Sequence, residues 1–424
     1  MEAYVLRRLV ALLGLTFAAL LTVLAGAAAA EGEQIVGTLA SGASGPIEGV
    51  TVTVTTADGD EVGSDTTDEN GRFEIDVPGA GDYVATIDAG DLPEGVTSSS
   101  AERPVTVGPN RAQRVAFALS DGSVGQGGGD TITVLQRFVE GLRFGLIIAI
   151  TAIGLSLIFG TTGLTNFAHG ELVAIGAAVA FIINVSFGVQ LIWATLLAVV
   201  VGAAIGGLND RLLWRPLRRR RTGLIAMLVI SIGLSIVLRY VLLIQLGGGQ
   251  QPYADYRGQR AEPYFGGIIT LTDKDVASII LSVVVLVAVA LMLQRTKIGK
   301  AMRAVADNRD LAASSGINVD RVILFVWMLG GALATFGGVL YGLSDQVAWD
   351  MGFRLLLLMF AGIILGGLGT AYGALVGSLI VGVFVQMSTL VIPDDLKNVG
   401  GLLLLIVILV VRPSGILGVR ERVG

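Results

Sequence analysis

The single histidine of the chain lies at residues 161–177, TTGLTNFAHGELVAIGA, between two long apolar runs. Asn166, His169 and Glu171 bring an amide, an imidazole and a carboxylate together in this short stretch. Such groups exchange hydrogen bonds and carry charge, and histidine and glutamate also bind metals. Because the chain has one histidine and no cysteine, multi-histidine and thiolate metal centres are excluded. We therefore predict no metal site.

The same stretch predicts a break between two helices. Gly163 interrupts the apolar run, Thr165 or Asn166 is suited to cap the next helix, and Glu171 falls in its first turns, where the helix dipole favours a negative charge. A carboxylate in lipid costs about 2.5–3.5 kcal/mol on insertion scales, so this group should face protein, water or the interface. Two roles remain open: a structural hydrogen-bond set that holds the break, or the lining of a translocation pathway by Asn166, His169, Gly170 and Glu171.

Composition identifies an integral membrane protein. Of 424 residues, 53% are hydrophobic and 15% charged, and the mean hydropathy is +0.76. Apolar stretches of about membrane-spanning length occur at 142–160, 171–188, 190–209, 223–245, 276–294, 322–343, 353–369, 371–391 and 398–411. They predict an all-α polytopic membrane bundle of about 8–9 transmembrane helices, with eight crossings plus a re-entrant segment as the alternative to nine.

A different pattern precedes the bundle. Phe73, Ile75 and Val77 alternate with charged residues, as on a half-buried strand, and similar short runs recur between turn pairs. A small β-sandwich follows from this pattern. The predicted domains are a signal peptide at 1–30, or an uncleaved anchor helix, the β-sandwich at 31–120, a Gly-rich linker at 121–134 and the membrane bundle at 135–424.

Charge predicts the orientation. Between residues 31 and 130 the chain has eighteen acidic and four basic residues, although the net charge of the whole is −5. Lys and Arg collect in cytoplasmic loops of membrane proteins. We therefore expect the β-sandwich outside the cytoplasm, and the loop 211–221, the loop 295–321 and the basic C-terminal tail inside.

The segment 294–321, QRTKIGKAMRAVADNRDLAASSGINVDR, predicts two short amphipathic helices. Apolar positions at 301, 304, 305, 311 and 312 give each piece one apolar face, and Gly316 should end the second. Such a segment either docks into a soluble partner or rests on lipid headgroups.

Small residues recur every four positions at Gly330, Ala334, Gly338 and Gly342, and again at Gly369, Gly373 and Gly377. This spacing places each set on one helix face. We predict close helix packing there; sliding of these faces during transport is the alternative.

Four stretches resemble one known family. GLTNFAHGELVAIGA, RPLRRRRTGLIAMLVISIGLSIVL, FAGIILGGLGTAYGALVGSLIVG and the segment from Gly299 to Gly342 look like the H-type permease subunit of branched-chain amino-acid ABC importers. The stretch TTDENGRFEIDVPGAGDYVATID resembles the carboxypeptidase-regulatory-like sandwiches, which are accessory modules of surface proteins.

The resemblance implies a permease subunit without enzymatic activity. The loop contacting an ATP-binding subunit would include Gly299, Arg303, Ala304, Asp307, Asn308, Ala312 and Gly316. No G-x-x-x-x-G-K-[ST] motif occurs, so ATP would be bound and hydrolysed by partner subunits and the chain itself needs no cofactor. The implied partners are a second homologous permease, two ATP-binding subunits, an extracytoplasmic substrate-binding protein and the lipid bilayer of the plasma membrane, and no nucleic acid.

Other functions compete with this one. Urea, short amides or other amino acids are alternative cargos. A stand-alone channel or secondary transporter would need an ionisable relay, yet the helix centres hold few such groups besides Arg239 and Arg354. A surface adhesion protein would need one anchoring helix only. For the β-sandwich, docking of the binding protein and a spacer role remain open.

Overall fold

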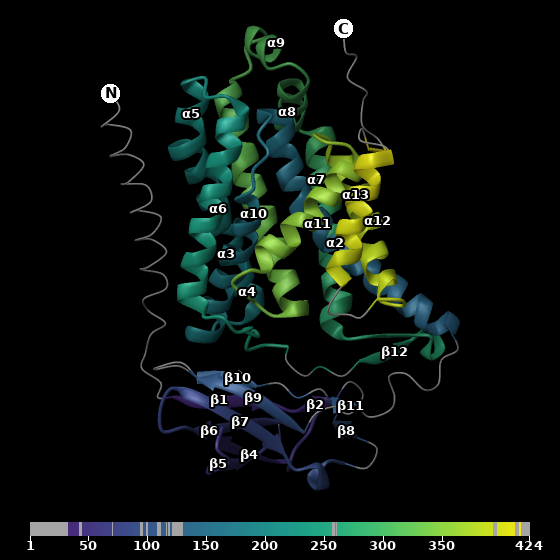
Figure 1. Ribbon diagram of the computed structural model, residues 1–424. Coiled ribbons are helices and arrows are strands. Elements are labelled where there is room, and N and C mark those ends of the chain that lie inside the picture. Colours follow the sequence, from purple (N-terminus) through teal and green to yellow (C-terminus); the bar gives the residue numbers. More distant parts are fainter. Residues whose placement is uncertain are drawn as a thin grey trace.

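The computed structural model contains a β-rich head followed by a helical body (Figure 1). It describes residues 33–41, 45–69, 71–93, 96–98, 101–107, 112–115, 117, 119–120, 130–256, 259, 261–392, 397–411 and 415–416. The predicted signal peptide and residues 121–129 of the predicted linker lie outside this range. Residues 130–134, expected as linker, already belong to the first helix of the body, α2.

The head consists of short strands in three sheets. Its strands are β1 (Gln34–Thr38), β2 (Ala40–Ser41), β3 (Gly45–Pro46), β4 (Thr51–Thr56), β5 (Glu61–Thr66), β6 (Arg72–Asp76), β7 (Gly81–Ile87), β8 (Thr97–Ser98), β9 (Glu102–Val107), β10 (Ala112–Val115) and β11 (Leu119–Ser120). The sheets have the strand orders β5-β4-β7-β9, β10-β1-β6 and β3-β2-β11-β8. A single-turn 3-10 helix, η2 (Ala89–Asp91), follows β7.

The alternation read from the sequence is present in β6. Phe73 and Ile75 are buried, while Arg72, Glu74 and Asp76 are exposed. The buried faces of the strands form one apolar cluster of their own, separate from the core of the body. The predicted small β domain is thereby confirmed. Strand β5 was not predicted, because as a sheet edge it carries mostly polar, partly exposed residues.

The body is built from long apolar helices. They are α2 (Asp130–Thr162), α3 (His169–Phe181), α4 (Leu191–Asn209), α6 (Leu224–Leu246), α7 (Asp273–Arg295), α10 (Val319–Asp345), α11 (Met351–Gly366), α12 (Ala371–Ser388) and α13 (Lys397–Val411). Each coincides with one of the nine predicted stretches. The start of α7 has a clear local cause, since Thr272 and Asp275 exchange the two hydrogen bonds of a capping box.

Seven of these helices in the described part of the chain are long and apolar enough to cross a membrane: α2, α3 with its π-helical extension η3 (Ile182–Ser186), α4, α6, α7, α10 and α12. Helices α11 and α13 are shorter, with 16 and 15 residues. The polytopic bundle is confirmed, and the two short helices account for the expected total of about 8–9.

Shorter elements connect the long helices. The π-helical turn η4 (Asp210–Trp214) and α5 (Arg215–Arg219) follow α4, so most of the basic stretch expected as a loop at 211–221 is helical. Helices α8 (Lys297–Asp307) and α9 (Arg309–Ser314) lie between α7 and α10. Between α6 and α7 are the hairpin β12 (Glu262–Tyr264) and β13 (Ile269–Leu271), with η5 (Phe265–Gly267) between them.

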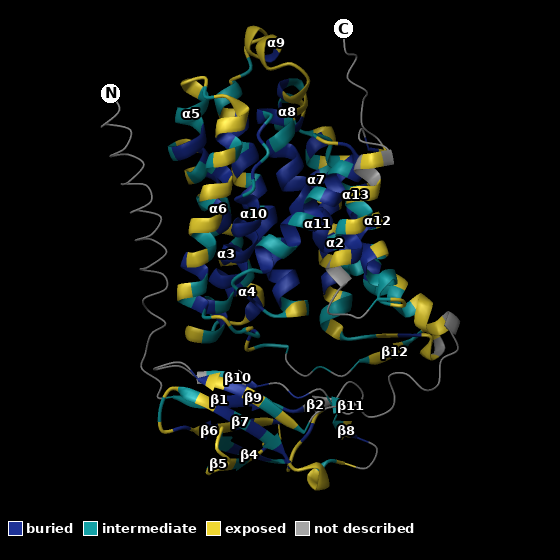
Figure 2. Ribbon diagram, viewed as in Figure 1, coloured by how far each residue is buried: buried dark blue, intermediate teal, exposed yellow. Residues whose placement is uncertain are grey.

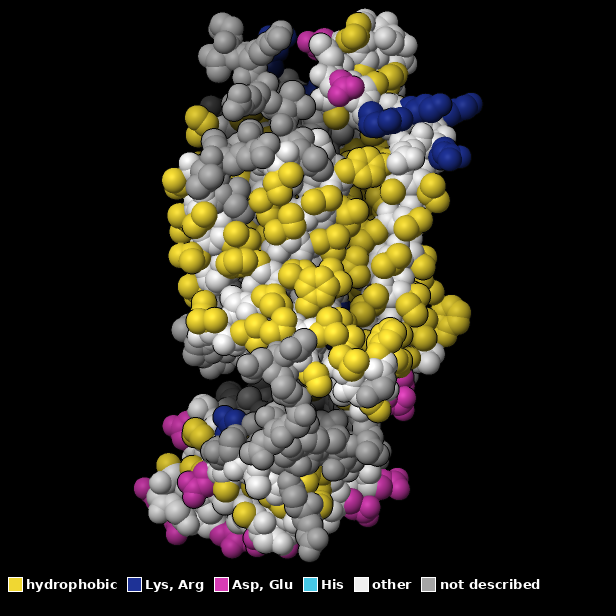
Figure 3. Space-filling model, turned by 90° about the vertical axis from the view of Figure 1, so that its right-hand side faces the viewer, with side chains coloured by type: hydrophobic (Ala, Val, Ile, Leu, Met, Phe, Trp, Pro, Cys, Tyr) yellow, Lys and Arg dark blue, Asp and Glu magenta, His cyan; other side chains and the backbone are white. Residues whose placement is uncertain are grey.

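The helices form an inner and an outer layer. Helices α2, α3, α10 and α11 are mostly buried, while α4, α6 and α7 expose apolar side chains along their outer faces (Figure 2). On the face drawn in Figure 3, hydrophobic side chains cover most of the body, Lys and Arg gather near one end, and most of the Asp and Glu side chains lie on the head. Helices α5, α8 and α9 lie together at the end of the body opposite the head (Figure 1). The basic segments 211–221 and 295–321 thus share one end, as the charge pattern predicts, while the arginines of the predicted basic C-terminal tail lie outside the described residues.

Candidate functional site

The predicted break is a re-entrant segment between α2 and α3. Helix α2 ends at Thr162, whose hydroxyl accepts a hydrogen bond from the Leu164 amide at 3.2 Å, and Gly163 has a φ of +70°. The chain then turns back into the bundle, and α3 begins at His169. The Nε2 atom of His169 lies 3.2 Å from the carbonyl oxygen of Thr151, about three turns before the end of α2. Helix α3 therefore starts well inside the bundle.

The capping of α3 differs from the expectation. The N-cap residue is Ala168, which makes no side-chain cap bond. Asn166 contributes from two residues earlier, because its Oδ1 accepts from the Ala168 amide at 3.1 Å. The Phe167 amide donates to Ser231 Oγ on α6 at 3.1 Å. The cap expected from Thr165 or Asn166 is therefore not formed on the first turn of α3; Asn166 and Ser231 instead bind the two amides that precede the helix, and Glu171 lies in its first turn as predicted.

The three polar side chains share one property. Asn166, His169 and Glu171 each have an exposure of 0%, and one end of each is hydrogen-bonded. The other end, Asn166 Nδ2, His169 Nδ1 or Glu171 Oε2, has no hydrogen-bond partner among the described residues. An unpaired buried polar atom costs about 1–3 kcal/mol, so three at one level of the bundle require an explanation.

Glu171 belongs to an ion pair inside the bundle. Its Oε1 accepts from Ser235 Oγ at 2.9 Å and from Nε and Nη2 of Arg239, each at 3.1 Å. The Arg239 guanidinium carbon lies 3.8 Å from the centre of the Phe353 ring on α11. The Glu171 side chain is fully buried, whereas the Arg239 side chain is 18% exposed. A charge exposed to lipid at a helix centre costs about 2.5–3.5 kcal/mol, so this face of α6 and α11 requires a partner other than lipid tails.

Gly170, predicted as a pathway residue, lies at a helix contact. A Cβ atom added there would come 2.5 Å from the Gly352 carbonyl oxygen and 2.9 Å from Leu356 Cβ. Only glycine allows α3 and α11 to approach this closely. The structure therefore gives Gly170 a packing role.

The segment 294–321, which the family resemblance assigns to a contact with an ATP-binding subunit, folds as two short helices, α8 and α9, with a sharp corner at Asn308. Asn308 ends α8, and its side chain caps α9 by accepting from the Leu311 amide at 2.9 Å. Gly316, with a φ of +86°, follows the end of α9 as predicted. Gly299 and Ala312 are buried and Ala304 is half-buried, while Arg303 and Asp307 are exposed. Of the predicted contact residues, Arg303, Asp307, Asn308 and Gly316 are exposed, and the first two offer charged side chains to a partner protein.

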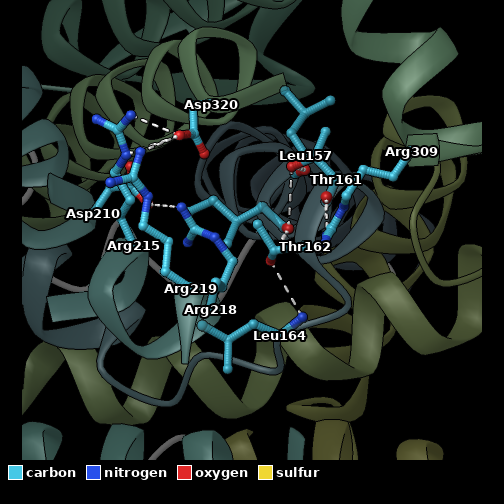
Figure 4. Close-up of polar contacts among 11 residues, drawn as sticks. Leu157, Thr161, Thr162, Leu164, Asp210, Arg215, Arg218, Arg219, Arg309 and Asp320 are labelled. Carbon is cyan, nitrogen blue, oxygen red and sulfur yellow. Dashed lines mark hydrogen bonds and ion pairs between the residues drawn. The ribbon is translucent and has the colours of Figure 1, made fainter. Parts of the chain in front are cut away.

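Arg309, at the start of α9, reaches the end of α2. Its Nη2 donates a hydrogen bond of 2.5 Å to the Thr161 carbonyl oxygen, and Figure 4 shows the two groups facing each other. Burial lowers the pKa of the Arg309 guanidinium, and the nearby charge of Arg218 lowers it further. The C-terminal end of a helix carries a partial negative charge that favours such a cation. Helix α9 is thus hydrogen-bonded to Thr161, two residues before Gly163, where the break between α2 and α3 lies.

Three arginines pair with two aspartates at this end of the bundle (Figure 4). Arg215 and Arg219 on α5 donate to Asp320 Oδ2 on α10 at 2.6 and 3.0 Å. Arg218 donates at 2.6 Å to Asp210, which is fully buried. The pairs with Asp320 hold α5 against α10, and the pair with Asp210 holds α5 against η4, so the basic stretch has a structural role beyond orientation.

The small-residue faces are closely packed, with one correction. A Cβ at Gly338 or Gly377 would clash with a backbone carbonyl oxygen, of Val173 or Gly362 respectively. A Cβ at Gly342 would lie 3.0 Å from the Tyr253 hydroxyl, and one at Gly373 would lie 2.6 Å from the Gly366 carbonyl oxygen. Gly369 is not on the same helix face as Gly373 and Gly377. It precedes α12 in a turn with a φ of +82°, because the preceding helix ends at Gly366.

Residues 137–411 match the family model for the branched-chain amino acid transport system permease component. The chain belongs to this permease family. Residues 34–120 match the carboxypeptidase regulatory-like domain. Both resemblances read from the sequence are confirmed, and a membrane location and a permease role follow from them together with the membrane-spanning helices.

Curated relatives align with this chain over nearly the whole of their own length. The high-affinity branched-chain amino acid transport system permease proteins LivH of Salmonella typhimurium LT2 and of Escherichia coli K12 are each 33% identical over 301 residues, which is 68% of this chain and 96% of theirs. The corresponding protein BraD of Pseudomonas aeruginosa PAO1 is 30% identical over 299 residues, 68% of this chain and 96% of its own. No solved structure matches significantly.

Proposed function

We propose that this permease is one subunit of an ATP-driven importer for branched-chain amino acids. Its partners would be a second homologous permease, two ATP-binding subunits and an extracytoplasmic protein that delivers the substrate. The proposal rests on the named cargo of the relatives and on the arrangement of α8 and α9. ATP binding and hydrolysis belong to the partners in this account, and the permease alternates access without covalent chemistry.

One contact carries the mechanism: the hydrogen bond from Arg309 to the Thr161 carbonyl oxygen. Closure of the ATP-binding subunits would push on α8 and α9 through the exposed Arg303 and Asp307. Arg309 passes that displacement to the end of α2, and Gly163 with its positive φ lets the re-entrant segment follow. Asn166, His169 and Glu171 would then change which side they face.

The proposed orientation places the head outside the cytoplasm. The head lies at one end of the body and α5, α8 and α9 lie at the other (Figure 1), and Arg and Lys are typical of cytoplasmic ends. The predicted signal peptide would export the head, and the plasma membrane would hold the body.

Co-purification tests the proposal. The tagged chain, extracted in mild detergent from its own membrane, should bring along a second permease and two proteins with nucleotide-binding motifs. Membrane vesicles from the same cells should take up radiolabelled leucine only with ATP. Recovery of the chain alone in several mild detergents, with leucine uptake that ignores ATP, would favour a stand-alone channel or secondary transporter instead.

A further inference from the structure

The buried ion pair between Glu171 on α3 and Arg239 on α6 has hydrogen-bonding atoms that the contact between the two helices does not use. Glu171 accepts all its hydrogen bonds on Oε1, and Oε2 has no partner among the described residues. Arg239 donates from Nε and Nη2, while Nη1 makes no hydrogen bond within the described part of the chain. Each charged group therefore keeps one side for a further ligand.

Burial argues against a purely structural pair. Replacing a buried ion pair by apolar side chains of similar volume is often neutral or stabilising, because both charges lose their hydration. The pair also leaves Arg239 18% exposed. A helix contact alone would be served at least as well by two apolar side chains, so the charges need another reason.

The position of the pair suits a substrate that comes from the side of the head. Arg239 lies about 10 Å before the end of α6 at Leu246, at a rise of about 1.5 Å per residue. This end leads into the segment with β12 and β13, between the head and the body (Figure 1). Phe353 covers the guanidinium, and Phe360 lies two turns further along α11, paired with Phe167 at a ring distance of 5.0 Å. Half-buried aromatic rings thus continue from the charged pair.

We infer that Glu171 and Arg239 form a recognition site for the zwitterionic head of an α-amino acid, an inference that rests on the proposed function. The substrate carboxylate binds the guanidinium of Arg239, whose planar fork fits a carboxylate with two hydrogen bonds. The substrate ammonium binds the carboxylate of Glu171. In this structure the two charges close on each other, and an entering zwitterion exchanges one ion pair for two. The phenylalanine rings receive the apolar side chain.

The proposed site should distinguish among the candidate cargos by their charged groups. Because the Glu171–Arg239 pair and the zwitterionic substrate each have no net charge, exchanging their ion pairs should give weak binding, as a translocation pathway requires. Urea or a short amide carries no charged group that could bind either residue. Leucine, leucinamide and 4-methylpentanoate share one side chain, but leucinamide lacks the carboxylate and 4-methylpentanoate lacks the ammonium. Their relative affinities therefore report on each charge separately.

The test uses the purified complex with its permease and ATP-binding partners in lipid nanodiscs, without the binding protein. Equilibrium binding of each radiolabelled compound should favour leucine about tenfold or more over both analogues, a difference of about one ion pair. Glu171→Gln should remove the preference over 4-methylpentanoate, and Arg239→Gln the preference over leucinamide. Arg354→Gln, which breaks the pair with Asp350 on α11, is the matched control and should keep both preferences.

A pair that only joins helices would change the affinity for all three compounds alike, and unchanged preferences in both variants would overturn the inference. If the variants do not assemble, equal wild-type affinities for the three compounds overturn it without them. Leucine uptake driven by ATP is measured on the same wild-type complex after reconstitution into proteoliposomes, with the binding protein added. Its absence refutes the proposed function, whereas uptake together with equal affinities refutes the recognition site alone.

Discussion

Arg309 on α9 donates a hydrogen bond of 2.5 Å to the Thr161 carbonyl oxygen at the end of α2. The two residues lie far apart in the sequence, yet this contact joins the short helices beyond the bundle to the re-entrant segment that enters it. Because the acceptor is a backbone oxygen, no substitution at residue 161 can test the contact directly, and the test falls on Arg309.

Arg309→Gln should uncouple transport from ATP hydrolysis. The amide side chain is too short to reach Thr161, while α9 keeps the Asn308 cap that holds it. We expect leucine transported per ATP to fall about tenfold, within the usual coupling range of about 1–3 kcal/mol. Arg321→Gln, an exposed arginine at the same end, should leave the ratio unchanged. An unchanged ratio in both variants would remove Arg309 from the coupling path.

Arg303→Glu should act at a different step. Arg303 is exposed on α8, so reversing its charge should leave the fold and membrane insertion intact. We expect loss of ATP-dependent uptake together with loss of the co-purified ATP-binding subunits, whereas Arg309→Gln should retain them. Normal uptake by the Arg303 variant would exclude it from the subunit contact.

Gly338→Leu should destabilise the bundle. A Cβ there would collide with the Val173 carbonyl oxygen, and overpacking of a well-packed core costs about 1–3 kcal/mol or more. Thermal unfolding in detergent should show a clear decrease of the Tm. Gly233→Ala is the matched control, because a Cβ on that part of α6 meets nothing within 4 Å. Its Tm should stay equal or rise, since alanine favours a helix over glycine by about 1 kcal/mol.

Deletion of residues 31–129 behind the predicted signal peptide should leave the apparent affinity for leucine uptake unchanged. The head has its own apolar core, around Val52, Phe73 and Ala85, so its removal opens no core in the body. A spacer role predicts this result. A substantial loss of apparent affinity with normal amounts of protein in the membrane would instead assign the head to docking of the binding protein.

The sequence allowed the helices to be predicted because lipid imposes long apolar runs. All nine predicted stretches correspond to helices, and the break at Gly163 and the end of α9 before Gly316 were recognisable from glycine between periodic segments. The mixed edge strand β5 gave no such alternation. Helix ends defined by turns were also missed, which is why Gly369 was assigned to the wrong face.

The contacts of the site could be predicted only in part. Asn166, His169 and Glu171 stood out as polar residues between apolar runs, and Arg239 as an isolated charge in an apolar helix. Nothing in the sequence joined Glu171 to Arg239, since pairing across helices depends on their packing. Arg309 was one arginine among many at the basic end. Because it donates to a backbone carbonyl oxygen, the contact does not restrict which amino acid occupies position 161.

The most direct test of the central claim is leucine transport by the complete complex in proteoliposomes, with ATP inside or outside and the binding protein outside. We predict accumulation of leucine against a gradient only when ATP reaches the side of α8 and α9 and the loaded binding protein is present on the side of the head. Equal leucine flux without ATP, or flux that stops at equilibration, would contradict an ATP-driven importer.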